Sequence, residues 1–214
     1  MGRVNLNGIP YSGLNSGVLM LNGKCYTYCE GNDIEEIYTA VNSSTGTFTA
    51  TVHGTYFAIV ADPSFEGGVS SMSVSSTHTP IYAVTTENCP YVICELEVGD
   101  TISYSTNPNK SIFAVYKVNR TVGQRVHDVR TGDAWNRYAP SDTTKQLIAV
   151  CWSGKENSSD YMKDECQITA RQLYRHFDAL CALYVFVADN PSECDLNVYA
   201  YYFGEARIVA FDLI

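Results

Sequence analysis

Eight cysteines and four histidines are the residues of this 214-residue chain with the widest chemistry. Cys25 and Cys29 are separated by three residues and Cys89 and Cys94 by four, so no Cys-x-x-Cys pair occurs. A zinc site would need ligands assembled from distant segments, which is one alternative. The other, which we favour, is that the thiols are reduced and pack as small hydrophobic side chains. The sequence therefore predicts no metal site.

Catalytic motifs are missing from the sequence. It contains no Gly-x-Ser-x-Gly elbow and no Gly-x-x-x-x-Gly-Lys phosphate loop. Cys151 or Cys181 could use His176 as a base only if the fold brought them together, and the thiol would then need a lowered pKa. The oxygen-rich segment 189–195 could hold calcium, although a solvated turn explains it equally. We predict a protein that is not an enzyme and has no cofactor.

Aromatic residues are the best candidates for binding. Strand alternation would place Tyr199 and Tyr201 on one face, where they would stack on a sugar ring or a partner protein if exposed. Burial in the core is the alternative. Trp135 and Trp152 are further candidates for ligand or partner contact.

Charge and composition restrict the partners. The net charge is −9, and the 14 Lys and Arg residues are scattered, which argues against nucleic acid. No stretch approaches the roughly 20 apolar residues of a membrane span. Only 17% of residues are charged, against roughly 25% in typical globular chains. We therefore expect exposed surfaces rich in Ser, Thr and Asn, which suit packing against neighbours, and synthesis in a cytoplasm without membrane insertion.

Residues 1–41 are predicted to form an N-terminal arm that ends in a short helix. The arm alternates apolar and polar residues before a turn, and its candidate docking residues are Val4, Leu6, Ile9 and Tyr11. Asn32 or Asp33 would cap the helix, whose apolar residues recur at helical spacing up to Val41.

Short strands between turns dominate the remaining sequence and predict a mainly β fold. We expect two tandem antiparallel β-sandwich domains of jelly-roll-like type, at residues 42–119 and 145–214, joined by a connector at 120–144. A second helix is expected from about Glu165 to Leu180, with a strand from Cys166 to Ala170 as the alternative.

The two halves also follow a similar plan. Residues 54–62 match the pattern of 145–153, residues 89–93 that of 181–186, and residues 112–118 that of 207–213. The order and approximate spacing agree, although few residues are identical. Apolar strands of unrelated sandwiches also look alike, so duplication and coincidence both remain open.

A resemblance adds to this reading. The opening VNLNGIPYSG, the segment TTENCPYVI at 85–93 and VGDTISY at 98–104 resemble small β-rich structural proteins of tailed bacteriophages. The resemblance implies a virion component of fibre, baseplate or capsid-decoration type, made in the host cytoplasm. It implies a homo-oligomer, with a trimer as one option, in contact with other virion proteins. The alternative is a carbohydrate-binding adhesin that recognises a host-surface glycan.

Overall fold

The computed structural model describes most of the chain from residue 33 onward and four short strands before it. The described residues are 4–6, 9–11, 17–21, 24–28, 33–61, 70–87, 89–106, 111–132, 135–138, 145–153, 170–177, 181–188, 196–199 and 205–214. Residues 1–32 and 33–214 are two separate compact units. Among the described residues, no helix is long and apolar enough to span a membrane.

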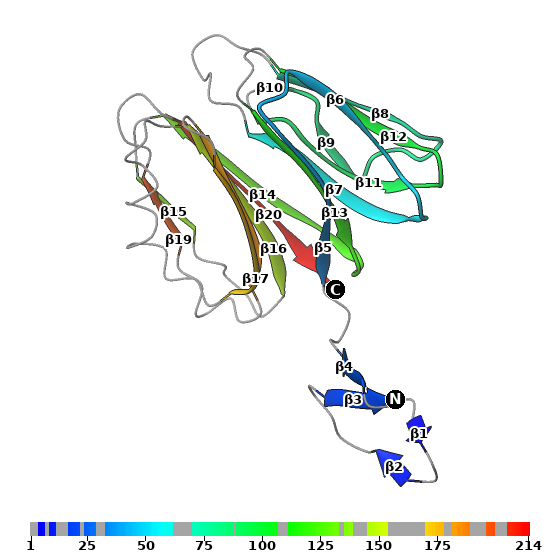
Figure 1. The fold of residues 1–214 in the computed structure, drawn as a ribbon. Coiled ribbons are helices and arrows are strands. Elements are labelled where there is room, and N and C mark those ends of the chain that lie inside the picture. Colours follow the sequence, from blue (N-terminus) through cyan, green and yellow to red (C-terminus); the bar gives the residue numbers. More distant parts are fainter. Residues whose placement is uncertain are drawn as a thin grey trace. The chain divides into compact units, whose positions relative to one another are not determined.

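The first unit contains two antiparallel hairpins (Figure 1). One joins β1 (Val4–Leu6) to β2 (Ile9–Tyr11), and the other joins β3 (Gly17–Leu21) to β4 (Lys24–Tyr28). β1 and β2 follow the predicted alternating pattern, and an Asn-Gly turn sequence lies between the strands of each hairpin.

The second unit begins with two antiparallel sheets. The four-stranded sheet has the order β10-β8-β12-β6, and the first five-stranded sheet has the order β5-β13-β7-β11-β9. Their strands are β5 (Ile34–Val41), β6 (Thr45–Thr49), β7 (Gly54–Ala61), β8 (Ser70–Ser75), β9 (Tyr82–Val84), β10 (Thr86–Glu87), β11 (Tyr91–Leu96), β12 (Thr101–Ser105) and β13 (Ile112–Val118).

A second five-stranded sheet follows, with the order β14-β20-β16-β18-β17, together with the pair β15-β19. Its strands and the pair are β14 (Val122–Gly132), β15 (Trp135–Tyr138), β16 (Gln146–Ser153), β17 (Ala170–Phe177), β18 (Cys181–Ala188), β19 (Leu196–Tyr199) and β20 (Glu205–Leu213).

The three large sheets stack as layers, with the first five-stranded sheet in the middle (Figure 1). One of its faces packs on the four-stranded sheet to form what we call the sandwich core, which includes Phe48, Tyr56 and Phe113. The other face packs on the second five-stranded sheet to form the shared core, which includes Phe57 and Phe211. Burial on both faces explains why β7, β11 and β13 of the middle sheet are nearly continuous apolar runs rather than alternating ones. β18 of the second five-stranded sheet is also buried along its whole length and has the same pattern.

Both predicted helices are wrong, because the described parts of both segments are strands. β5 pairs with β13 throughout, but Glu36 lies opposite Tyr116 and Tyr38 opposite Val115, so Ile37 is an extra residue at a β-bulge. The bulge interrupts the two-residue alternation and gives the apolar residues a helix-like spacing. The register of β17 shifts in the same way between Ala170 and Leu173. The rest of the second expected helix lies outside the described residues.

The segment 120–144, expected to be a connector, contains two strands among its described residues. Most of its first half is β14, an edge strand of the second five-stranded sheet, and β15 lies further along. β5, which precedes the expected boundary between residues 41 and 42, pairs with β13 in one sheet.

The two five-stranded sheets have equivalent strand orders. In each sheet, the first strand of the half lies beside the last strand, and the third strand of the half comes next: β5-β13-β7 in the first half and β14-β20-β16 in the second. The segments matched in the sequence fall at equivalent positions: β7 corresponds to β16, β11 to β18, and β13 to β20. The pair β15-β19 corresponds in the same way to β6-β12. Strand order, which is independent of apolar composition, therefore supports the repeated plan.

Candidate functional site

The aromatic residues singled out from the sequence are partly brought together. Trp135 of β15 lies directly opposite Tyr199 of β19. Trp152 lies in a different sheet, opposite Ala182 on one side and Ala206 on the other. Tyr201 lies outside the described residues. The expected pair of Tyr199 with Tyr201 therefore stays a prediction, and the register adds Trp135 as a neighbour of Tyr199.

The four residues predicted for the docking arm occupy one hairpin. Val4 lies opposite Tyr11, and Leu6 lies opposite Ile9. The apolar positions of β1 are thus aligned with the apolar positions of β2. Their role in docking is a prediction.

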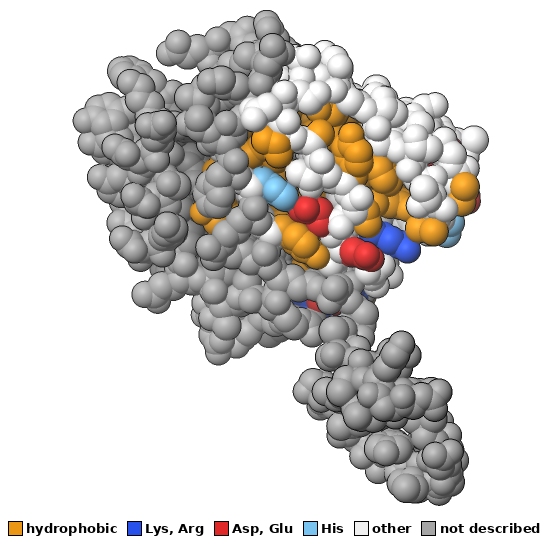
Figure 2. Space-filling view, viewed as in Figure 1, with side chains coloured by type: hydrophobic (Ala, Val, Ile, Leu, Met, Phe, Trp, Pro, Cys, Tyr) orange, Lys and Arg blue, Asp and Glu red, His pale blue; other side chains and the backbone are white. Residues whose placement is uncertain are grey.

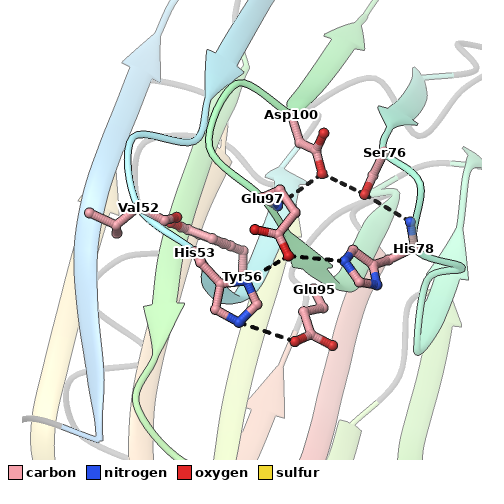
Figure 3. A network of polar contacts seen from close by, with 8 residues as sticks. All are labelled: Val52, His53, Tyr56, Ser76, His78, Glu95, Glu97 and Asp100. Carbon is pink, nitrogen blue, oxygen red and sulfur yellow. Dashed lines mark hydrogen bonds and ion pairs between the residues drawn. The ribbon is translucent and has the colours of Figure 1, made fainter.

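A polar cluster that spacing alone did not indicate lies at one end of the first two sheets (Figure 3). His53 contacts Glu95 at 3.3 Å through Nε2 and Glu97 at 3.1 Å through Nδ1. His78 Nε2 lies 3.4 Å from the same Glu97 carboxylate. The histidines come from the β6–β7 and β8–β9 connections, 25 positions apart, so only the fold brings them together.

Hydrogen bonds within the cluster also stabilise the turn between β11 and β12. The Ser76 hydroxyl donates to Asp100 at 2.6 Å, and the Glu97 backbone N–H donates to the same carboxylate at 2.9 Å. These two hydrogen bonds lower the pKa of Asp100. The Ser76 hydroxyl donates to Asp100 and accepts from the His78 backbone N–H, not from a histidine ring, so the arrangement does not create an activated nucleophile.

The outer face of the four-stranded sheet is an ordered set of hydroxyl groups. Alternation along β6, β8 and β12 sends the large apolar residues into the sandwich core and the small polar residues outward. Thr101 lies between Thr49 and Ser75, and Ser103 lies between Thr47 and Ser73. We call this surface the hydroxyl face; it comprises Thr45, Thr47, Thr49, Ser71, Ser73, Ser75, Thr101, Ser103 and Ser105.

The hydroxyl face carries no charged side chain among these nine residues, as the low charged fraction predicts. The Thr47 and Ser103 hydroxyls lie 2.9 Å apart and bond to each other across the strands. Few charged side chains are also visible among the described residues on the face viewed in Figure 2. A hydroxyl surface loses less on desolvation than a charged one, so it suits contact with another molecule.

Ion pairs with a buried arginine lie around the shared core. Arg207 of β20 is 3% exposed and makes a two-point contact with Asp128, at 2.9 Å through Nε and 2.6 Å through Nη2. Its Nη1 donates to Glu87 at 3.1 Å, and the guanidinium lies over the Tyr91 ring. Burial alone would lower the pKa of Arg207, but the hydrogen bonds and charge of Asp128 raise it. The contact links the second half to the first.

The buried thiols of the two cores are not poised as nucleophiles. Burial and the neighbouring Cys89 raise the pKa of Cys151 well above its ordinary value, and burial raises the pKa of Cys94 to about 12. The Cys181 thiol donates to the Ala61 carbonyl at 3.8 Å. A thiol of raised pKa is a poor nucleophile, so these groups fit the expected role as small core side chains.

β5 and β17 are edge strands of the two five-stranded sheets. His176 of β17 contacts Glu36 of β5 at 2.5 Å. Both side chains are about four-fifths buried. Burial would raise the pKa of Glu36, but the hydrogen bond and charge of His176 contribute to a net lowering. His176 is thus paired with a carboxylate that joins the two halves.

Within the described residues, no group of three His, Cys, Asp or Glu side chains is arranged to hold a metal ion. The calcium-like segment 189–195 lies outside those residues. Comparisons with models of protein families, with curated proteins and with solved structures found no match for the chain.

Proposed function

We propose that the chain is a non-enzymatic structural subunit of a tailed-bacteriophage virion, of head-fibre, decoration, tail or baseplate type. It assembles through its N-terminal arm and its β domains. The observation that supports this role best is the hydroxyl face, an uncharged exposed sheet surface on a chain of net charge −9. Such a surface can be buried against a neighbour without desolvating charge.

The strand order adds support. The first half has eight principal strands when β9 is treated as an added edge strand. Numbered in chain order, the first, eighth, third and sixth (β5-β13-β7-β11) form one sheet. The second, seventh, fourth and fifth (β6-β12-β8-β10) form the other. This is the order of an eight-stranded jelly roll. We infer that the first half is a jelly roll and that the second half repeats it. Jelly rolls are common in viral capsid and lectin domains.

The separate compact unit formed by residues 1–32 fits a docking arm, because it makes its own hairpins. Partners under this proposal are other copies of the chain and other virion proteins. The chain would be made in the host cytoplasm and incorporated in the virion.

Light scattering over a concentration series tests the proposal. The full chain is expected to exceed the monomer mass, and a version lacking residues 1–32 is expected to form smaller assemblies. The variant should keep its β-sheet circular dichroism, because residues 33–214 are a compact unit. A full chain that is monomeric at every concentration contradicts homo-assembly.

Carbohydrate binding is the second candidate, favoured by the alignment of Trp135 with Tyr199 across neighbouring strands. Aromatic residues of this kind stack on sugar rings when exposed. Binding on a glycan array that Trp135→Ala abolishes and Trp152→Ala preserves would support it. An array without binding would remove this candidate.

A further inference from the structure

The edge strand β6 is open on one side. It is the last strand of its sheet and pairs with β12, and in the described part of the chain no strand lies on its other side. Thr106 N–H donates to the Ser44 carbonyl, and Ala50 N–H donates to the Asp100 carbonyl. In an antiparallel ladder, hydrogen bonding to one neighbour alternates by residue. The backbone N–H and C=O groups of Thr45, Thr47 and Thr49 therefore point away from β12, toward the open edge, where the Thr45 carbonyl also accepts from the Ser43 hydroxyl at 2.7 Å.

The other described edges of the three large sheets carry protection of the kinds that prevent strand addition. β5 has a bulge at Ile37 and acidic residues beside it. β9 and β10 are very short. β14 and β17 each have a register irregularity and basic side chains in their sequences.

β6 has none of these protections. Its sequence, Thr-Gly-Thr-Phe-Thr, contains no charge and no proline, and its pairing with β12 is regular over five residues. Its threonines have high β propensity and are exposed. An edge of this kind is a template for another strand.

We propose that β6 pairs antiparallel with β6 of a second copy of the chain, about a two-fold axis through Thr47. The sequence is close to symmetric about this residue, so Thr45 of one copy meets Thr49 of the other and Gly46 meets Phe48. Thr47 meets its own copy in a hydrogen-bonded pair, because its N–H and C=O both point outward. Facing threonines are favourable cross-strand partners.

The near-symmetric sequence of β6 favours a second copy as the occupant, because a two-fold pairing repeats the same contacts on both sides of Thr47. Two chains of net charge −9 repel each other. The pairing limits this repulsion, because the surfaces that come closest, β6 and the hydroxyl face, carry no charged side chains. The two four-stranded sheets would become one continuous sheet, and the hydroxyl faces would join. A five-residue strand buries less than the roughly 800 Å² per partner of a stable dimer, so this contact alone gives concentration-dependent association.

This inference rests on the proposed assembly role and specifies one of its contacts. Sedimentation velocity of the full chain tests it with Thr47→Pro and Thr47→Lys. Both changes remove the hydroxyl contact with Ser103 but no backbone hydrogen bond to β12, because the Thr47 N–H points outward, and both block the edge. Ser73→Lys is the matched control, since it places the same charge on the hydroxyl face away from the edge. We expect both Thr47 variants to lose the concentration-dependent dimer and Ser73→Lys to keep it.

A cross-link tests the register independently of any loss of folding. In the two-fold pairing, two Thr47→Cys residues face each other with Cα atoms about 5.5 Å apart, within disulfide range. Oxidation with glutathione disulfide, which is reduced to two glutathione molecules, should give a covalent dimer that neither the parent chain nor Ser73→Cys gives.

The outcomes separate the two proposals. Assembly that survives both Thr47 variants, or a Thr47→Cys chain that does not cross-link, overturns the β6 pairing and leaves the structural role standing. A parent chain that is monomeric at every concentration overturns both the pairing and homo-assembly.

Discussion

The two faces of the middle sheet differ in whether ion pairs accompany their apolar packing. The sandwich core is filled by apolar and aromatic side chains, with Tyr104 and Phe113 stacked 4.2 Å apart between ring centroids. The shared core is equally apolar at its centre, where Phe57 meets Phe211 with ring centroids 5.4 Å apart. Its margins, however, carry ion pairs between the two halves.

Apolar packing stabilises both cores, whereas the ion pairs fix how the two halves align with each other. Apolar packing tolerates small shifts, whereas a buried ion pair that loses one partner leaves an uncompensated charge. Arg207 with Glu87 at one side and His176 with Glu36 at the other therefore restrict the halves to one alignment. The sandwich core needs no such device, because short connections join its two sheets repeatedly.

The largest effect should come from the centre of the shared core. Phe57→Ala removes a fully buried ring and should lower the free energy of unfolding by about 3–5 kcal/mol. Phe113→Ala, on the opposite face of the sheet, should cost a similar amount, and exposed Val98→Ala should cost under about 0.5 kcal/mol. Urea denaturation measures all three. A loss under about 1 kcal/mol for Phe57→Ala would show that the second sheet does not pack there.

Removal of the Arg207 charge should have the next largest effect. Arg207→Met should cost about 2–4 kcal/mol, below the upper range for a buried pair because Asp128 is 27% exposed. The double variant with Asp128→Asn should recover part of the loss, since it removes the unpaired carboxylate. Urea denaturation of the two single variants and the double variant completes the cycle. Strictly additive losses would contradict the pairing.

Glu36 should make the free energy of unfolding depend on pH in the acidic range. Its pKa lies below the ordinary 4.5 in the folded protein, so its contribution is fully present above pH 4.5 and is lost as the pH falls through the folded pKa. Glu36→Gln should lose about 1–2 kcal/mol at pH 7 and show a flatter stability profile below pH 4.5. Glu35→Gln, a change at the exposed neighbour, should retain the parent profile. Identical profiles for Glu36→Gln and the parent would contradict the His176 contact.

The exposed histidine cluster should contribute least. His53 and its carboxylate partners are about half exposed, so His53→Ala should change the free energy of unfolding by under about 0.5 kcal/mol at pH 7. Thermal unfolding at low and high salt measures this change. A loss above 1 kcal/mol would place the cluster with the buried pairs instead.

Much of the fold could be predicted from the sequence because burial leaves a direct pattern. Continuous apolar runs indicated β7, β11, β13, β16 and β18, and the matched segments fall in equivalent strands. The same kind of pattern gave a wrong helix for β5, because the extra residue at the Ile37 bulge turns strand alternation into helix-like spacing. The shared core was also beyond the sequence pattern, because a strand buried on both faces does not reveal which sheet covers it.

The polar contacts were less predictable. The sequence indicated a surface rich in Ser and Thr, and the hydroxyl face confirms it on one sheet. The contacts of His53 with Glu97 and of Arg207 with Asp128 join residues 44 and 79 positions apart. Neither has a local spacing signal, so only the folded topology brings the partners together.

Hydrogen–deuterium exchange of the full chain tests most directly whether the two five-stranded sheets form one cooperative unit. The amides of β7 in the first half and β16 in the second should be among the slowest, with the same opening free energy and the same urea dependence. Exchange from β16 and β18 at a much lower opening free energy than from β7 and β11 would contradict the shared core.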